Sequence, residues 1–180
     1  HPQTGVQTTL FKGLVSRVKR LGLYKNKHIP QAYIRGSLDQ RLELLAGLID
    51  SDGYIYQSNS RICFSNTNKR LIDDVADLVR SLGSRATVAS FPPKTSSSGI
   101  VGKKIVYQLT FNLDLPLPTA LPRKKWSGKP YQKRRRGIIS VERVAPKQGN
   151  CIQVEGGIYL VGRNLIPTHN SAAMLNISIQ

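Results

Sequence analysis

Two acidic residues, Asp50 and Asp52, stand where an amphipathic helix should end. Ser37 and Gln40 have the spacing of a capping box, and apolar residues follow at helical intervals, namely Leu38, Leu42, Leu45 and Ile49. This pattern predicts a helix over 37–49. A helix C-terminus carries partial negative charge, so each carboxylate there costs about 0.3–1 kcal/mol unless a cation neutralises it. A metal ion held by Asp52 would be such a cation.

Residues 44–53, LLAGLIDSDG, resemble the LAGLIDADG motif of homing endonucleases, with Ser51 where the motif has alanine. The resemblance implies hydrolysis of DNA phosphodiesters, with Asp52 as a Mg²⁺ ligand and Asp50 as a supporting or capping acid. Mg²⁺ suits this chemistry because it binds through one or two carboxylates together with phosphate oxygens. Ala46 and Gly47 are expected to form a face that admits a second helix. The alternative is a buried helix followed by an Asp-Ser-Asp-Gly turn.

The segment Lys27-His28-Ile29-Pro30 is similar to the one that precedes the second motif in intein-borne endonucleases. By this resemblance Lys27 would stabilise charge at the cleavage centre, with a plain surface lysine as the alternative and Lys124 as a second candidate. An active centre of this family needs acids from two motif helices, whereas this sequence holds one motif. The other half would lie upstream of His1 or in a second copy, and the position of the lysine segment favours the upstream half.

A second group of reactive residues lies at 165–171, Leu-Ile-Pro-Thr-His-Asn-Ser. The side-chain amide of Asn170 can attack its own carbonyl and cut the backbone, and His169 can give a proton to the leaving amine. The Ser171 hydroxyl can accept an acyl group. Together these residue types predict autocatalytic peptide cleavage after Asn170, without a cofactor.

The stretch from Cys151 to Ser171 resembles the C-terminal splicing segments of inteins, which belong to an all-β Hint domain. Asn170 would then cyclise with help from His169, and Ser171 would begin the C-extein. Cys151 is either a small buried hydrophobe or, with Thr168, the nucleophile of inteins that lack an N-terminal one. Many inteins carry a second histidine between the two β segments, and residues 156–158 hold none.

The charge balance favours a polyanionic partner, because Lys and Arg number 27 against 10 acidic residues, for a net charge of +17. Double-stranded DNA is the expected partner, either through a basic run that interleaves Trp126 and Tyr131 or with that run as a solvated linker. The run comprises Arg123, Lys124, Lys125, Lys129, Lys133, Arg134, Arg135 and Arg136. No apolar run reaches the roughly 18 residues of a membrane span. Two cysteines make no disulfide framework and favour the cytoplasm.

The expected fold class is α+β. Helices are predicted over 9–21, 37–49 and 68–82, and strands over 54–56, 61–65, 86–91 and 105–112, with irregular chain over 113–122. Further β segments are predicted over 138–144, 151–155 and 159–161. By resemblance, residues 1–136 would be the second half of an endonuclease with helices on an antiparallel β saddle, 137–170 the end of a Hint domain and 171–180 the host.

Residues 171–180, SAAMLNISIQ, are similar to the start of the helix after a phosphate-binding loop, most of all in replicative helicases of the DnaB type. Two other functions compete with an intein fragment. A stand-alone LAGLIDADG endonuclease or maturase would leave 151–171 unexplained. A catalytically inactive DNA-binding module would explain neither Asp52 beside Lys27 nor the junction at Asn170.

Overall fold

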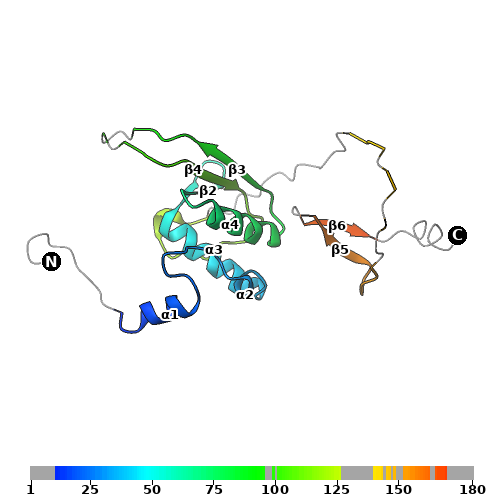
Figure 1. Ribbon diagram of the computed structural model, residues 1–180, viewed down its shortest axis with the longest axis horizontal. Coiled ribbons are helices and arrows are strands. Elements are labelled where there is room, and N and C mark those ends of the chain that lie inside the picture. Colours follow the sequence, from blue (N-terminus) through cyan, green and yellow to red (C-terminus); the bar gives the residue numbers. More distant parts are fainter. Residues whose placement is uncertain are drawn as a thin grey trace, which may run out of the picture.

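The computed structural model describes residues 11–95, 99, 101–126, 140–143, 145–146, 148, 152–162 and 165–169. Helices α1 (Leu14–Arg20), α2 (Gln31–Ile34), α3 (Leu38–Asp52) and α4 (Lys69–Ser81) accompany a four-stranded sheet, and a separate hairpin follows further along the chain (Figure 1). Helices and antiparallel strands thus occur in one chain, which confirms the predicted α+β class.

Helix α3 begins at the predicted capping box. The Gln40 amide donates to Ser37 Oγ at 3.3 Å, and the Ser37 amide donates to Gln40 Oε1 at 3.0 Å. The helix continues through Asp52, three residues beyond the predicted end, so both acids of the motif lie in its last turn. Helix α1 starts later than predicted, within the described residues, and the short α2 lies in a stretch for which no helix was predicted.

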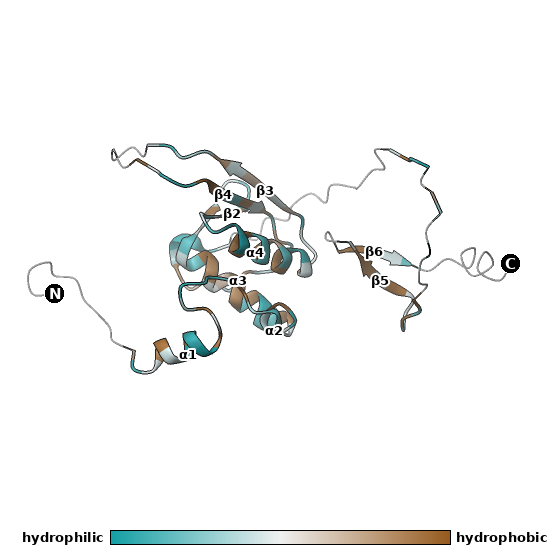
Figure 2. Cartoon of the chain, viewed as in Figure 1, coloured by the Kyte–Doolittle hydropathy of each residue, from teal (hydrophilic) through white to brown (hydrophobic). Residues whose placement is uncertain are grey.

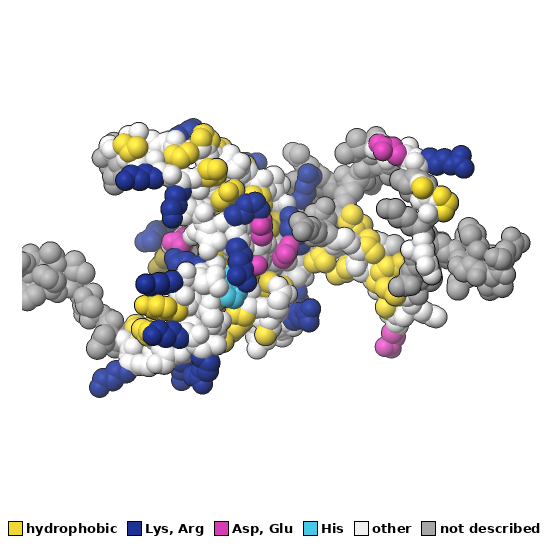
Figure 3. Space-filling view, in the orientation of Figure 1, with side chains coloured by type: hydrophobic (Ala, Val, Ile, Leu, Met, Phe, Trp, Pro, Cys, Tyr) yellow, Lys and Arg dark blue, Asp and Glu magenta, His cyan; other side chains and the backbone are white. Residues whose placement is uncertain are grey.

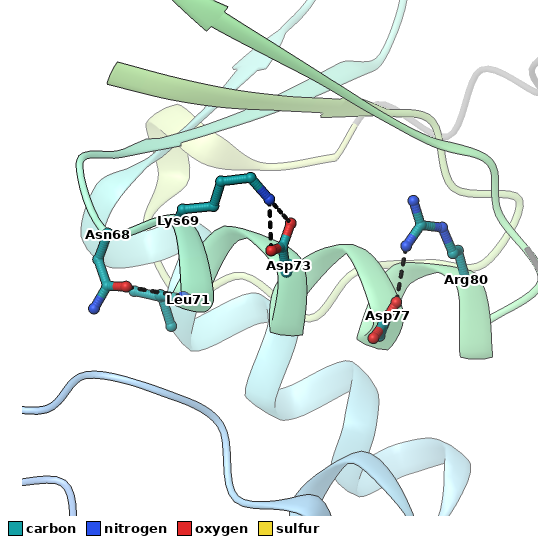
Figure 4. Close-up of polar contacts among 6 residues, drawn as sticks. All are labelled: Asn68, Lys69, Leu71, Asp73, Asp77 and Arg80. Carbon is teal, nitrogen blue, oxygen red and sulfur yellow. Dashed lines mark hydrogen bonds and ion pairs between the residues drawn. The ribbon is translucent and has the colours of Figure 1, made fainter. Parts of the chain in front are cut away.

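Helix α4 has the predicted start, because the Asn68 side chain accepts the Leu71 amide at 3.3 Å (Figure 4). Two ion pairs, Lys69–Asp73 and Asp77–Arg80, run along its surface at 2.7 and 2.8 Å. Such surface pairs contribute little to stability. The helix is held mainly by its apolar face, on which Leu71, Ile72, Val75, Ala76, Leu78 and Val79 are buried.

The four-stranded sheet is antiparallel in the order β1-β2-β4-β3, formed by β1 (Gly53–Tyr56), β2 (Arg61–Asn66), β4 (Val106–Phe111) and β3 (Ala86–Phe91). Its register pairs Gly53 with Phe64 and Ile62 with Phe111. Helices α3 and α4 both pack against one face of the sheet, while the other face has no helix over it among the described residues (Figure 1). Hydrophobic segments of α3 and α4 appear brown in Figure 2.

The core lies between this sheet face and the two helices. Leu45 and Ile49 of α3, Ile62 and Leu109 of the sheet, and Ile72 of α4 are fully buried. The segment after β4 adds Leu113 and Leu117, and half-buried Trp126 packs against the same cluster. Chain that was predicted to be irregular therefore belongs to the body of the domain, and residues 122–124 form a single 3-10 turn (Pro122–Lys124) there.

The separate hairpin pairs β5 (Ile158–Val161) with β6 (Ile166–His169). Strand β5 matches the predicted segment 159–161. The predictions for 138–144 and 151–155 were wrong for the residues described there, because 140–143 and 152–155 have no strand. The strand that precedes Asn170 is instead β6, which contains His169.

Basic side chains dominate the charged surface. Lys and Arg residues are spread over the visible face of the part that carries the helices, with few acidic side chains between them (Figure 3). None of the helices within the described ranges is both long and apolar enough to cross a membrane.

Candidate functional site

The two acids of the motif point to opposite sides of α3, because residues two apart on a helix are separated by about 200°. The half-buried Asp50 carboxylate accepts the backbone amides of Ala120 at 2.7 Å and Leu121 at 3.3 Å. Asp52 is exposed and has no hydrogen-bond or ion-pair partner among the described residues. The Asp50 carboxylate thus holds the segment after β4 by hydrogen bonds, whereas the Asp52 carboxylate is available to bind a ligand.

The cation at the end of α3 is Lys124. Its buried ammonium group donates to the carbonyl oxygens of Ile49 and Asp50, each at 2.8 Å, and lies 3.5 Å from that of Ser51. The Ile49 carbonyl also accepts the Gly53 amide, whereas the carbonyls after it lie in the last turn, where a helix leaves acceptors unsatisfied. A positive charge at this end also interacts favourably with the helix dipole. Lys124 therefore places a positive charge at this helix end, where the sequence had suggested a metal ion.

Two glycines of the motif have different reasons for being glycine. A Cβ on Gly53 would lie 2.7 Å from Ile49 Cα, so the turn from α3 into β1 requires the missing side chain. A Cβ on exposed Gly47 would meet nothing within 4 Å. Ala46 is 3% exposed and faces the core, so the expectation that Ala46 and Gly47 share one open face was wrong. Neighbouring residues of a helix diverge by about 100°.

The open face of α3 runs through half-buried Leu44 and Leu48 on either side of Gly47. Both leucine side chains also pack against the core cluster, and the face borders a groove of about 420 Å³ between α2 and α3. The groove is lined by Ala32, Tyr33, Gly36, Gln40, Glu43 and Leu44. This face combines apolar side chains with close access to the helix backbone at Gly47.

A Mg²⁺ ion would find one free carboxylate here. No group of three or more His, Cys, Asp and Glu side chains able to hold a metal occurs in the described part of the chain. The exposed carboxylate of Asp52 fits one ligand of a Mg²⁺ ion, which takes few protein ligands and keeps waters and phosphate oxygens. The described residues therefore fit a share of a metal site.

The backbone of Lys27 lies beside the N-terminus of α4. The Lys27 carbonyl oxygen accepts a hydrogen bond from Asn68 Nδ2 at 2.9 Å, and two residues further on the Ile29 amide donates to Asp74 Oδ2 at 2.8 Å. The Lys27 side chain is exposed, and no contact with Asp52 occurs among the described residues. Gly53, which follows Asp52, pairs with Phe64 near the end of β2, and α4 starts just after β2. Because Lys27 contacts the Asn68 cap of α4, Lys27 and Asp52 lie at the same end of the domain.

The sheet face without helices carries aromatic and polar side chains. Tyr54 and Tyr56 are 58% and 42% exposed, with ring centroids 4.8 Å apart, and Arg61 lies opposite Tyr56. Between Tyr54 and Thr110 lies Cys63, which is buried although it is outside the core cluster. Burial raises the pKa of the Cys63 thiol, and the Arg61 guanidinium partly offsets this.

The predicted basic run is described only at its start. Arg123 and Lys125 are exposed, as expected of residues that contact a polyanion, whereas Lys124 is the buried cap of α3. The other members of the run lie outside the described residues, namely Lys129, Lys133, Arg134, Arg135 and Arg136. Their contact with DNA stays a prediction.

Two of the residues predicted for splicing are seen. Thr168 and His169 lie in β6, opposite Tyr159 and Ile158, and the Thr168 hydroxyl donates to the Ile166 carbonyl at 3.3 Å. The other three, Cys151, Asn170 and Ser171, lie outside the described residues.

Sequence reasoning missed the partners of Asp50 and the helix-capping role of Lys124. Lys124 stood out only as one of several basic residues, and it is separated from Asp50 by 74 positions. No local pattern links residues so far apart, so no signal in this single sequence could have identified the pair.

Comparison with known proteins is consistent with this geometry. Residues 39–111 match the LAGLIDADG-like domain. The chain is 37% identical over 179 residues to the replicative DNA helicase DnaB of Mycobacterium intracellulare, covering 91% of this chain and 29% of the helicase. It is 30% identical over 94 residues to the homothallic switching endonuclease of Saccharomyces cerevisiae, covering 49% of this chain and 16% of the endonuclease.

The chain thus spans less than a third of the length of either relative. The matched range contains α3 from Asp39 onward, α4 and all four strands of the larger sheet. Residues 39–111, the range that matches the LAGLIDADG-like domain, thus have an α+β fold.

Proposed function

We propose that this chain is the C-terminal part of an intein, in which half of a Mg²⁺-dependent homing endonuclease precedes the C-terminal splicing segment. The observation that supports the endonuclease proposal is the difference in hydrogen bonding between the two motif acids. Asp50 is bound to Ala120 and Leu121, while Asp52 is exposed and without a partner in the described part of the chain. Asp52 would be the metal ligand, and a bound Mg²⁺ would neutralise charge on the scissile phosphate.

The sheet face without helices supports a DNA-binding role. It presents Tyr54, Tyr56 and Arg61 on a four-stranded antiparallel sheet. Most of the affinity would come from phosphate contacts by basic residues, including Arg123 and Lys125. Lys27, at the same end of the domain as Asp52, would stabilise charge near the cleavage centre.

The open face of α3 is proposed to receive the upstream half of the same intein. Leu44 and Leu48 provide apolar contact, and Gly47 lets a second helix approach the backbone closely. That half would bring the acid that completes the metal site, which fits the finding that the described residues hold one free carboxylate at this point.

The splicing part of the proposal depends on the order of reactive residues at 168–171. Asn170 would cyclise, His169 would protonate the leaving amine, and Ser171 would begin the C-extein. Cys151 with Thr168 would act on the upstream junction. The similarity to DnaB of M. intracellulare over 91% of this chain supports a helicase of that type as the host.

The test uses the complete intein within its host gene. An endonuclease carried by an insert should not cut the gene that the insert interrupts, so the DNA probe is a plasmid with the flanking host coding sequences joined directly. We expect Mg²⁺-dependent cleavage at the joined site by the wild type and none by Asp52→Asn. The control Asp39→Asn changes an exposed acid at the other end of α3 and should cleave normally. Equal cleavage by Asp52→Asn would contradict the proposal.

Splicing is read from the same precursor. The host protein should appear ligated, with an excised protein ending at Asn170, and Asn170→Ala should abolish release of the C-extein. Splicing should continue in Asp52→Asn. Loss of splicing in a folded Asp52→Asn protein would contradict the separation of the two sites.

A further inference from the structure

The imidazole of His169 lies directly against the backbone of Gly157. A Cβ on Gly157 would lie 2.8 Å from His169 Nε2 and 3.3 Å from both Cδ2 and Cε1. The equal distances to the two carbons show that the Nε2 end of the ring is the part that approaches Gly157. A separation of 2.8 Å is shorter than carbon–nitrogen packing contacts allow, so a side chain here would displace the ring.

The contact is built into the hairpin. Ile158, which follows Gly157, pairs with His169 across β5 and β6, and the Gly157 amide donates to the Val154 carbonyl at 3.0 Å. Gly157 also has a left-handed φ of +68°, which favours glycine. The turn and the strand pairing therefore fix where the glycine lies relative to the ring.

Left-handed backbone does not by itself explain the contact. Gly156 and Gly162 have φ values of +77° and +67°, yet a Cβ on either would meet nothing within 4 Å. Gly157 alone of these three combines the left-handed conformation with a ring against its Cα. Its missing side chain leaves the space in which the His169 ring lies.

The position of this ring matters because the chain has one histidine after residue 28. Proton transfer at the Asn170 junction would thus depend on His169 without a second imidazole from residues 29–180. A general acid must reach its proton acceptor within hydrogen-bonding distance, so small displacements of the ring are costly.

We propose that Gly157 is a positioning residue for His169, leaving space for the Nε2 end of the imidazole so that the ring is held in place for proton transfer during cleavage after Asn170. The inference depends on the proposed splicing function. In the step concerned, the Asn170 side-chain nitrogen bonds to its own carbonyl carbon and loses a proton, and the peptide bond to Ser171 breaks. The leaving amine gains a proton, which His169 supplies.

The test compares three alanine variants of the complete precursor, Gly157→Ala, Gly156→Ala and Gly162→Ala. All three place a side chain at a left-handed position, so they share the backbone strain, and only the first meets the His169 ring. We expect cleavage after Asn170 to slow about a hundredfold in Gly157→Ala, as for a catalytic group displaced by about 1 Å. The other two variants should stay within about threefold of the wild type.

Equal rates for Gly157→Ala and Gly156→Ala would overturn the positioning role while leaving splicing intact. Failure of the proposed function looks different, because the wild type itself would then release no more C-extein than Asn170→Ala.

A spectroscopic measurement separates positioning from loss of fold. In the non-cleaving Asn170→Ala precursor with labelled histidine, nuclear Overhauser effects should connect the Gly157 Hα protons with the His169 ring. They should persist with Gly156→Ala and disappear with Gly157→Ala, while effects between Tyr159 and Thr168 report that the hairpin remains. Absence of the Gly157–His169 effect in the parent precursor would overturn the proposal even if Gly157→Ala did not fold.

Discussion

Lys124 and Asp50 fasten the same two segments together in opposite directions. The Lys124 ammonium donates to the Asp50 carbonyl at 2.8 Å, and the Asp50 carboxylate accepts the Ala120 amide at 2.7 Å. The segment after β4 is thereby attached to the last turn of α3 by charge-assisted hydrogen bonds at Ala120 and at Lys124. The end of the motif helix is shaped by this attachment.

Replacing Lys124 with Met should lower the free energy of unfolding by about 2 kcal/mol. The variant keeps an apolar side chain of similar length but leaves the Ile49 and Asp50 carbonyls without their charged donor. Urea unfolding followed by circular dichroism measures the loss. Lys125→Met is the matched control, because Lys125 is exposed, and it should change stability by less than about 0.5 kcal/mol. Equal effects of the two would argue against the cap.

The two motif acids should separate stability from cleavage. Asp50→Asn removes a charged acceptor of two backbone amides and should cost about 1 kcal/mol. Asp52→Asn removes an exposed carboxylate from a helix C-terminus and should raise stability by about 0.3 kcal/mol. Denaturant midpoints of the two variants give the comparison. A larger loss of stability for Asp52→Asn than for Asp50→Asn would show that their roles are reversed.

The two motif glycines should respond oppositely to alanine. Gly47→Ala has room for its side chain inside a helix and should stabilise this chain by about 1 kcal/mol. Gly53→Ala would place a Cβ 2.7 Å from Ile49 Cα and should destabilise by about 1–3 kcal/mol. Thermal unfolding of both variants is the measurement.

The same substitution tests the proposed partner face. In the complete intein, Gly47→Ala should weaken DNA cleavage although it stabilises the fold, because the methyl group would hold the second helix away. Full cleavage by Gly47→Ala would place the partner half elsewhere.

Ionisation of the Cys63 thiol should lower the stability of the folded protein at alkaline pH. Burial raises its pKa above the ordinary value of 9.0, so the folded state retains a proton that the unfolded state releases. The stabilisation is complete below the pKa of the unfolded thiol and is lost as pH rises through the higher pKa of the folded state. The difference in stability between the wild type and Cys63→Ala should therefore shrink as pH rises above the ordinary thiol pKa of 9.0. A difference that is constant from pH 7 to 10 would contradict this.

Local patterns were sufficient for the parts of the fold that local physics determines. The capping box of Ser37 and Gln40 and the Asn68 cap located the starts of α3 and α4, and strand β3 was predicted with its observed bounds. The end of α3 was placed too early, because the sequence near Ile49 contains no sign that a distant lysine continues the helix.

The candidate site was predictable in its acids and not in its surroundings. Spacing and type singled out Asp52, but the division of roles between Asp50 and Asp52 depends on Ala120 and Leu121, which have no distinguishing side-chain chemistry. Strand β6 was not predicted because it contains Pro167, and proline is unusual inside a sheet. The proline occurs here in a two-stranded sheet.

The lysine cap also has a consequence for the order in which the domain is completed. Lys124 follows Ile49 by 75 positions, so during synthesis α3 and all four strands of the larger sheet emerge before the cation that finishes the helix. A contact of such long range closes a large loop and forms late in folding. A fragment cut at Phe111, where the family match stops, would therefore contain all four strands of the larger sheet and still lack the lysine cap of the motif helix. A unit that keeps the lysine cap and the packed Trp126 side chain must extend at least to residue 126.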